Sequence, residues 1–244
     1  MPINNPDHIE YTIINGHVQI VVEGGRQLPA YWAHPDLGGT FPGVVLIHDW
    51  WGITSVERRL AGRFAQSGYY VIVPDLFNGS TATTPQEAIA LVEALGDSGY
   101  RLVDTALTTL EQHVRCSRDV AAVGLGMGGT LAFHAALTRV DLESAVACYG
   151  FPQRMLGQFG KAQTPIMAIY GEHEPHVDPT VIARLRAELR ESPLDHQVVT
   201  LAGAGREFFE QDTAAGAEAW RQMLTFIESH HKHTHTVESP DAPL

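Results

Sequence analysis

The stretch from Val120 to His134 constrains the fold more than any other part of this sequence. It reads VAAVGLGMGGTLAFH, an apolar run that ends in closely spaced glycines and leads directly into a helical pattern. Glycine permits sharp backbone turns and the close approach of neighbouring chain segments. We therefore predict a buried strand over 121–125, a tight turn at Gly126 and a helix over 127–138.

Strand and helix patterns alternate along most of the chain. Short apolar runs typical of buried parallel strands occupy residues 43–47, 70–75, 144–149, 165–170 and 197–201. Helical patterns cover residues 55–66, 85–95, 100–114, 179–189 and 214–228. Such alternation predicts right-handed βαβ units in a mostly parallel, doubly wound α/β sheet with helices on both faces.

The two ends of the chain show other patterns. Near the N-terminus we predict strands over 11–14 and 18–22, joined by Asn15-Gly16, a dipeptide typical of hairpin turns, and then a strand over 28–33. One domain is expected over 1–228. The His-containing tail, 229–244, is polar and is expected to pack little.

Composition limits the classes of function. A net charge of −12 argues against a nucleic-acid surface. There is no run of about 20 apolar residues to suggest a membrane span, and the first residues lack the basic and apolar regions of a secretory signal. We expect a cytoplasmic protein, with Cys116 and Cys148 reduced, that meets a small molecule and needs no cofactor. The sequence leaves the oligomeric state open.

Five stretches together resemble the dienelactone hydrolase family of α/β-hydrolases. They are the strands before Pro35, and residues 44–52, 68–77, 120–134 and 168–177. The resemblance covers roughly residues 9–228 and implies an α/β-hydrolase fold, in which the glycine-rich turn is a nucleophile elbow. It also implies carboxylic ester or lactone hydrolysis by a Cys or Ser nucleophile, an Asp and a His.

The residues at the family's catalytic positions differ in this chain. Gly126 stands at the nucleophile position, Glu174 at the acid position and Arg206 at the His position. Asp49 stands where a further family carboxylate is usually Glu. Glycine has no attacking atom, and a guanidinium stays protonated, so it cannot act as a base. We therefore predict that triad-based hydrolysis is absent and that Glu174 and Arg206 form an ion pair.

The start of the elbow helix is expected to keep an anion-accepting pocket. The Met127 amide and the backbone near Asp49 and Trp50 would donate to a negative group, which the helix dipole favours. Together with His48, these are the candidate ligand-binding residues. Trp50 and Trp51 either line the pocket or pack under the first helix. The main objection to the pocket is the charge of Asp49.

Two functional hypotheses remain open. The first is a non-catalytic protein that binds a small carboxylate or lactone. The second is a repurposed enzyme that uses Asp49, Glu174, the crevice histidines or a bound water in non-covalent acid–base chemistry, which would need a carboxylate with a raised pKa.

Some residues are given structural rather than chemical roles. The segment His173-Glu174-Pro175-His176 is interpreted as a solvated loop and not as a metal site, since Pro175 prevents helical pairing of the imidazoles. Ser55 is expected to cap a helix. Cys148 is interpreted as a small buried apolar residue, and Cys116 as a structural residue at a helix end.

Overall fold

A computed structural model describes residues 11–231 and 236–237 of the chain. The strands are β1 (Ile13–Val21), β2 (Gln27–Pro35), β3 (Gly39–Ile47), β4 (Tyr70–Pro74), β5 (Cys116–Leu125), β6 (Ser144–Cys148), β7 (Ile166–Gly171), β8 (Gln197–Leu201) and β9 (Thr236–Val237). The helices are α1 (Ser55–Gln66), α2 (Pro85–Leu95), α3 (Ser98–Glu111), α4 (Met127–Thr138), α5 (Pro179–Leu189) and α6 (Ala214–His230). Short 3-10 turns are η1 (Glu23–Gly25), η2 (Gln153–Met155) and η3 (Phe159–Lys161).

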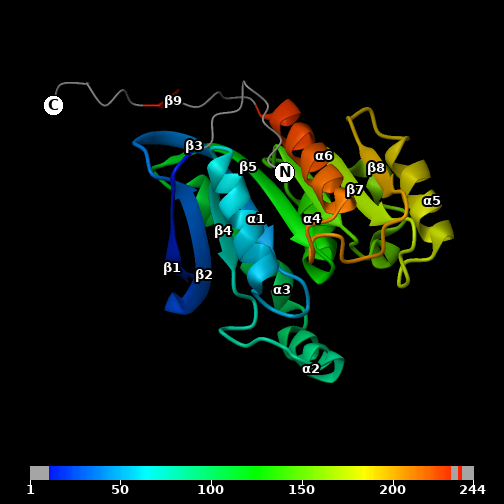
Figure 1. The fold of residues 1–244 in the computed structure, drawn as a ribbon, viewed down its shortest axis with the longest axis horizontal. Helices are drawn as coiled ribbons and strands as arrows, with labels where there is room; N and C mark the ends of the chain where they lie inside the picture. The colour runs from blue at the N-terminus through cyan, green and yellow to red at the C-terminus, as the bar shows by residue number, and fades with distance from the viewer. Residues whose placement is uncertain (1–10, 232–235, 238–244) are drawn as a thin grey trace.

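The strands form one twisted sheet in the order β1-β2-β4-β3-β5-β6-β7-β8. All neighbours from β4 to β8 are parallel, whereas β2 pairs antiparallel with both β1 and β4. Helices α1 and α6 lie in front of the sheet in Figure 1, and α3 and α4 pack together behind it. This arrangement confirms the predicted doubly wound, mostly parallel α/β sheet.

The antiparallel pair at the N-terminal edge differs from the predicted hairpin. Asn15 and Gly16 lie inside the continuous strand β1, and the chain reverses at η1 instead. Gly16 is paired with Trp32, and a Cβ at residue 16 would lie 3.0 Å from the Trp32 indole nitrogen. Glycine here therefore makes room for a large cross-strand neighbour, which overrides the local turn preference of the dipeptide.

The C-terminal tail, predicted to pack little, contributes to both a helix and the sheet. Helix α6 continues to His230, and β9 pairs antiparallel with β3, with Thr236 opposite Thr40 and Val237 opposite Gly39. The remaining predicted tail residues, 232–235 and 238–244, lie outside the described part of the chain.

The core lies on both faces of the central strands. Val44 to Ile47 of β3 and Val120 to Val123 of β5 are fully buried. Burial on both faces explains why these strands appear in the sequence as continuous apolar runs and not as alternating patterns.

The glycine-rich turn brings three backbone segments together at the carboxyl end of β5. A Cβ at Gly124 would overlap the Gly128 carbonyl, and a Cβ at Gly128 would overlap the Ile47 carbonyl. Glycine at residues 124 and 128 is therefore needed for the close approach of α4 to β3 and β5. The predicted strand, turn and helix are all present, and α4 begins at Met127 as expected.

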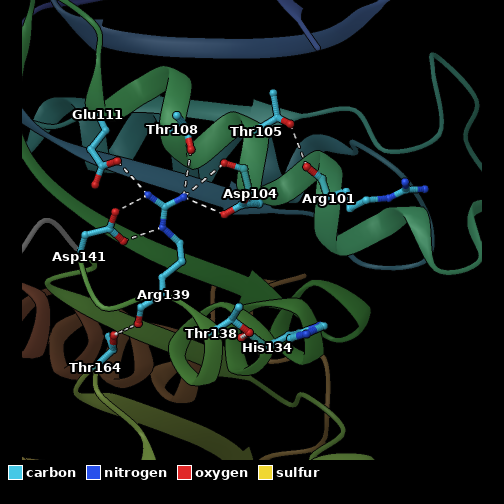
Figure 2. A network of polar contacts seen from close by, with 10 residues as sticks. All are labelled: Arg101, Asp104, Thr105, Thr108, Glu111, His134, Thr138, Arg139, Asp141 and Thr164. Carbon is cyan, nitrogen blue, oxygen red and sulfur yellow. Dashed lines mark hydrogen bonds and ion pairs between the residues drawn. The ribbon is translucent and has the colours of Figure 1, made fainter. Parts of the chain in front are cut away.

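A buried arginine holds the opposite end of α4. Figure 2 shows the Arg139 guanidinium surrounded by Asp104 and Glu111 of α3 and by Asp141, each at 2.8 Å. Thr108 accepts a further hydrogen bond from it at 3.1 Å. The Arg139 side chain is only 9% exposed, so this cluster fixes α3 against the loop that follows α4.

Two local predictions need correction. Thr54, not Ser55, is the N-cap of α1, and its side chain forms a capping box with Glu57. Cys116 begins strand β5 and does not end a helix, because α3 stops at Glu111. Within the described residues, no helix combines the length and apolar character needed to cross a membrane.

Candidate functional site

The site is built around Gly126, the glycine at the turn from β5 into α4. Gly126 lies between β5 and α4 with φ +51° and ψ −109°, a conformation that most side chains disfavour. A Cβ added at Gly126 would overlap the Cγ and both oxygens of Asp49. The Asp49 carboxylate therefore occupies the space that a residue-126 side chain would fill.

This carboxylate also takes the backbone donors at the start of α4. Asp49 Oδ1 accepts hydrogen bonds from the Met127 N–H at 2.8 Å and from the Trp50 N–H at 2.7 Å. These are the amides that the sequence analysis expects to hold a bound anion. The protein's own carboxylate is thus the anion at the helix N-terminus, and the amides are not vacant.

Burial changes the acidity of Asp49. Loss of hydration raises the pKa of Asp49 to about 6, although the hydrogen bonds from Met127 and Trp50 and the charge of Arg206 oppose the rise. Asp49 is 7% exposed and lines the main cavity of the site. Near neutral pH it therefore has access to both its protonated and its ionised form.

Glu174 and Arg206 form the predicted ion pair. Arg206 Nη1 donates to Glu174 Oε1 at 2.9 Å, and the two side chains are 10% and 2% exposed. Glu174 Oε1 also accepts from the His176 amide at 2.9 Å. The guanidinium lies over the rings of Phe151 at 4.6 Å and Tyr149 at 5.0 Å. The Arg206 guanidinium is therefore held by one carboxylate and two aromatic rings.

The Arg206 guanidinium retains unused donors. Only Nη1 makes a hydrogen bond to a residue in the described ranges, so Nη2 and Nε are available for an acceptor in the cavity that Arg206 lines.

His48 has a structural role. Its ring is fully buried, and Nε2 accepts a hydrogen bond from the Leu76 N–H at 3.0 Å. Nδ1 must then carry the proton and donate to the Asp49 carbonyl at 2.7 Å. Burial lowers the pKa of His48, which keeps the ring neutral. This imidazole does not line the cavity and instead fixes the loop that carries Asp49.

The cavity above Asp49 has a volume of about 640 Å³, enough for a small organic molecule. Trp50 contributes to its wall and meets Trp51 edge to face at 5.1 Å. Helix α2, which buries only Ala88 along its length, contributes Val92. The lining residues are Asp49, Trp50, Val92, Met127, Thr130, Leu131, Phe151, Gln153, Arg154, His176, Arg206 and Glu207.

Sequence reasoning missed the part of the wall that follows β6. Phe151, Gln153 and Arg154 line the cavity there. The available signal was their position just beyond the carboxyl end of a parallel strand, where ligands of α/β folds bind. Arg154 is exposed and makes no ion pair with any residue between 11 and 231.

Neither cysteine supplies a replacement nucleophile in this structure. Both are free and buried. Burial raises the pKa of Cys116 to about 11 and that of Cys148 further above its usual range. A thiol that stays protonated is a weak nucleophile.

The described residues contain no group of three or more His, Cys, Asp or Glu side chains arranged to hold a metal ion. His176 lines the cavity, whereas His48 lies in the core and does not line it.

Comparison with known proteins gives one consistent family. The model of the dienelactone hydrolase family matches residues 28–231. The chain is similar to the protein usf of Aquifex pyrophilus, with 26% identity over 223 residues that cover 85% of this chain and 96% of that protein.

Solved structures show the same fold. A dienelactone hydrolase-like promiscuous phosphotriesterase from metagenomic libraries aligns with a TM-score of 0.80 at 21% identity, covering 89% of this chain and 98% of that one. A dienelactone hydrolase from Anabaena variabilis aligns with a TM-score of 0.68 at 21% identity, covering 89% and 99%. At this identity the likeness establishes the α/β-hydrolase fold alone.

Proposed function

This chain belongs to the dienelactone hydrolase family, and we propose that it binds a small carboxylate or lactone without forming a covalent intermediate. The single observation that carries the proposal is the position of Asp49. Its carboxylate fills the nucleophile's space beside Gly126 and accepts the Met127 and Trp50 amides. Covalent acyl transfer needs both an attacking atom and vacant oxyanion donors, and this arrangement supplies neither.

The main cavity retains the means to hold a ligand. Leu131, Phe151 and Val92 provide apolar surface for an organic body. Arg206 offers its unused Nη2 and Nε donors, and Arg154, which makes no ion pair within the described ranges, offers a cation at the same cavity. A carboxylate or a lactone carbonyl is the acceptor that such guanidinium groups favour.

Asp49 makes binding of an acid dependent on pH. An ionised Asp49 repels a ligand carboxylate, and its pKa is raised to about 6. Protonation below that pH removes the repulsion and creates a hydroxyl donor. Acids should therefore bind more tightly at pH 5 than at pH 8, whereas neutral lactones should show little change.

Titration calorimetry with a set of small aromatic and aliphatic carboxylates and their matching lactones tests the proposal. Arg206→Lys keeps the charge but loses the forked donor set, so we expect at least fivefold weaker binding. Arg184→Lys is the matched control, since Arg184 is 61% exposed and lies outside the cavity lining. Equal binding by both variants, or an acyl adduct in the intact mass, contradicts the proposal.

A second candidate function rests on the raised pKa of Asp49. A carboxylate that titrates near pH 6 at the base of an apolar cavity is suited to non-covalent general acid–base chemistry. Asp49→Asn separates the two candidates. If Asp49 is a base, the variant loses turnover of a bound lactone; if the protein only binds, there is no turnover to lose and acids bind more tightly above pH 6.

A further inference from the structure

A second cavity, with a volume of about 430 Å³, adjoins the main cavity of the site. Of the described residues, only Asp49 and Glu207 line both cavities. Glu207 is exposed, whereas Asp49 is 7% exposed. Glu207 therefore lies at the rim of the boundary between the two cavities, and Asp49 forms its buried part.

Three segments of the chain contribute residues to both cavities within one or two positions of each other. The pairs, with the residue of the main cavity first, are Met127 and Leu125, Phe151 and Tyr149, and Trp50 and Trp51. The residue between Leu125 and Met127 is Gly126, and the Asp49 carboxylate fills the space that a side chain at Gly126 would take. The boundary between the cavities therefore falls at Gly126 and is closed by Asp49.

The Asp49 side chain is held firmly in this boundary. Its Oδ1 accepts hydrogen bonds from the Met127 N–H at 2.8 Å and from the Trp50 N–H at 2.7 Å. Two hydrogen bonds from backbone amides to one carboxylate oxygen oppose rotation of the side chain. Asp49 is therefore a fixed part of the wall and not a side chain that a ligand can push aside at low cost.

The position of Arg206 decides which part of a ligand meets this wall. Arg206 lines the main cavity and not the second one, and its charge acts on the Asp49 carboxylate. A carbonyl or carboxylate that accepts from the guanidinium therefore lies close to Asp49. A substituent attached beyond that acceptor group would have to enter the space that Asp49 fills.

We propose that Asp49 determines the class of ligand that the main cavity accepts. It admits molecules that end at their acceptor group, such as free acids and compact lactones, and excludes open-chain esters and N-substituted amides, which continue beyond it. This inference rests on the proposed function, in which Arg206 holds the acceptor group. Truncation of Asp49 to alanine should join the two cavities, because Gly126 has no side chain to close the gap. Leu125 and Val56 of the second cavity would then contact the added substituent.

Titration calorimetry with phenylacetamide and N-butylphenylacetamide at pH 8 tests the inference. Both compounds are uncharged, and amides resist hydrolysis. The unaltered protein should bind the N-butyl compound no more tightly than phenylacetamide, although each buried methylene would tighten binding about fourfold. This measurement does not depend on the folding of any variant. Binding of the N-butyl compound at least tenfold more tightly than phenylacetamide would overturn the inference.

Two variants then separate the size of the Asp49 side chain from its charge. Asp49→Asn and Asp49→Ala both remove the charge, but only alanine removes the atoms that close the boundary. The ratio of the two amide affinities should be unchanged in Asp49→Asn and should rise at least tenfold in favour of the N-butyl compound in Asp49→Ala. Thermal unfolding establishes that each variant is folded at the temperature of titration. An equal ratio in the two folded variants would overturn the inference.

Failure of the proposed function would give a different result. If the unaltered protein binds neither phenylacetamide nor phenylacetate, the main cavity holds no acceptor group, and both proposals are overturned. If both compounds bind and Arg206→Lys weakens their binding, while the amide ratio is equal in Asp49→Asn and Asp49→Ala, the inference about Asp49 alone is overturned.

Discussion

The Asp49 carboxylate accepts a hydrogen bond from the Met127 amide at 2.8 Å and lies where a side chain at residue 126 would be. The same carboxylate therefore occupies both the space beside residue 126 and the amide donor at the start of α4. It also shows why glycine suits residue 126, since any larger residue would displace the carboxylate. An internal carboxylate thus occupies the centre of the site at the start of α4.

We predict no burst of p-nitrophenol from p-nitrophenyl acetate and no acyl-enzyme by intact mass spectrometry, because Gly126 has no side chain to supply the attacking atom. Iodoacetamide should leave native Cys116 and Cys148 unmodified at pH 7.5, since burial raises the pKa of both thiols. Urea-unfolded protein is the control and should be modified at both. A burst with an adduct on the native chain would disprove this account.

We predict that Asp49→Asn stabilises the protein at pH 8 by about 1–3 kcal/mol, because the amide keeps the Oδ1 acceptor without a buried charge. The pKa of Asp49 is raised to about 6 in the folded state, so the native protein binds this proton more tightly than the unfolded chain. The contribution of Asp49 to the free energy of unfolding then falls as pH rises from about 4 to 6. Urea titrations should show that the difference in free energy of unfolding between Asp49→Asn and the unaltered protein vanishes near pH 4. A difference that does not change with pH would contradict the prediction.

Breaking the Glu174–Arg206 pair should be costly, since both side chains are buried. Arg206→Met leaves an uncompensated carboxylate and is expected to lower the free energy of unfolding by about 3–5 kcal/mol. Glu174→Gln retains an acceptor for Arg206 and should cost less. Arg221→Met, which breaks an exposed pair with Glu218, is the control and should stay within about 0.5 kcal/mol. Similar losses for Arg206→Met and the control would refute the structural role.

The Arg139 cluster in Figure 2 should also contribute to stability. Arg139→Met leaves three neighbouring carboxylates without their cation, so we expect a loss of about 2–4 kcal/mol at pH 7 and low salt. The loss should shrink as the pH is lowered, because burial raises the pKa of Glu111 and protonation removes its negative charge. Arg221→Met is the control, since Arg221 is 55% exposed. A loss that does not depend on pH would indicate packing rather than charge.

Local patterns predicted most elements of the fold. The bounds of α1, α2, α4, α5 and β8 agree with the sequence prediction, because the residues that mark these elements lie within the segments or directly beside them. The prediction of a turn at Asn15-Gly16 is wrong. Gly16 pairs with Trp32 of the neighbouring strand β2, and this cross-strand contact is not visible in the local sequence.

The site could be predicted from the sequence only in part. The residues that differ from the family's usual ones, Gly126, Glu174 and Arg206, can be identified in the sequence. The expected ion pair between Glu174 and Arg206 is confirmed. The position of Asp49 was not predicted, because it depends on how closely the end of β3 approaches the start of α4. From the sequence, Asp49 is expected to repel a bound anion, whereas in the structure its own carboxylate accepts a hydrogen bond from the Met127 amide.

The most direct test of this account is a double-mutant cycle between Gly126→Ala and Asp49→Ala, measured by urea unfolding at pH 8. The backbone strain of alanine at φ +51° is present in both backgrounds and cancels. If the Asp49 carboxylate fills the residue-126 space, Gly126→Ala should cost at least about 1 kcal/mol less once Asp49 is alanine. Costs that add within about 0.5 kcal/mol would show that the two residues do not meet and would contradict the central claim.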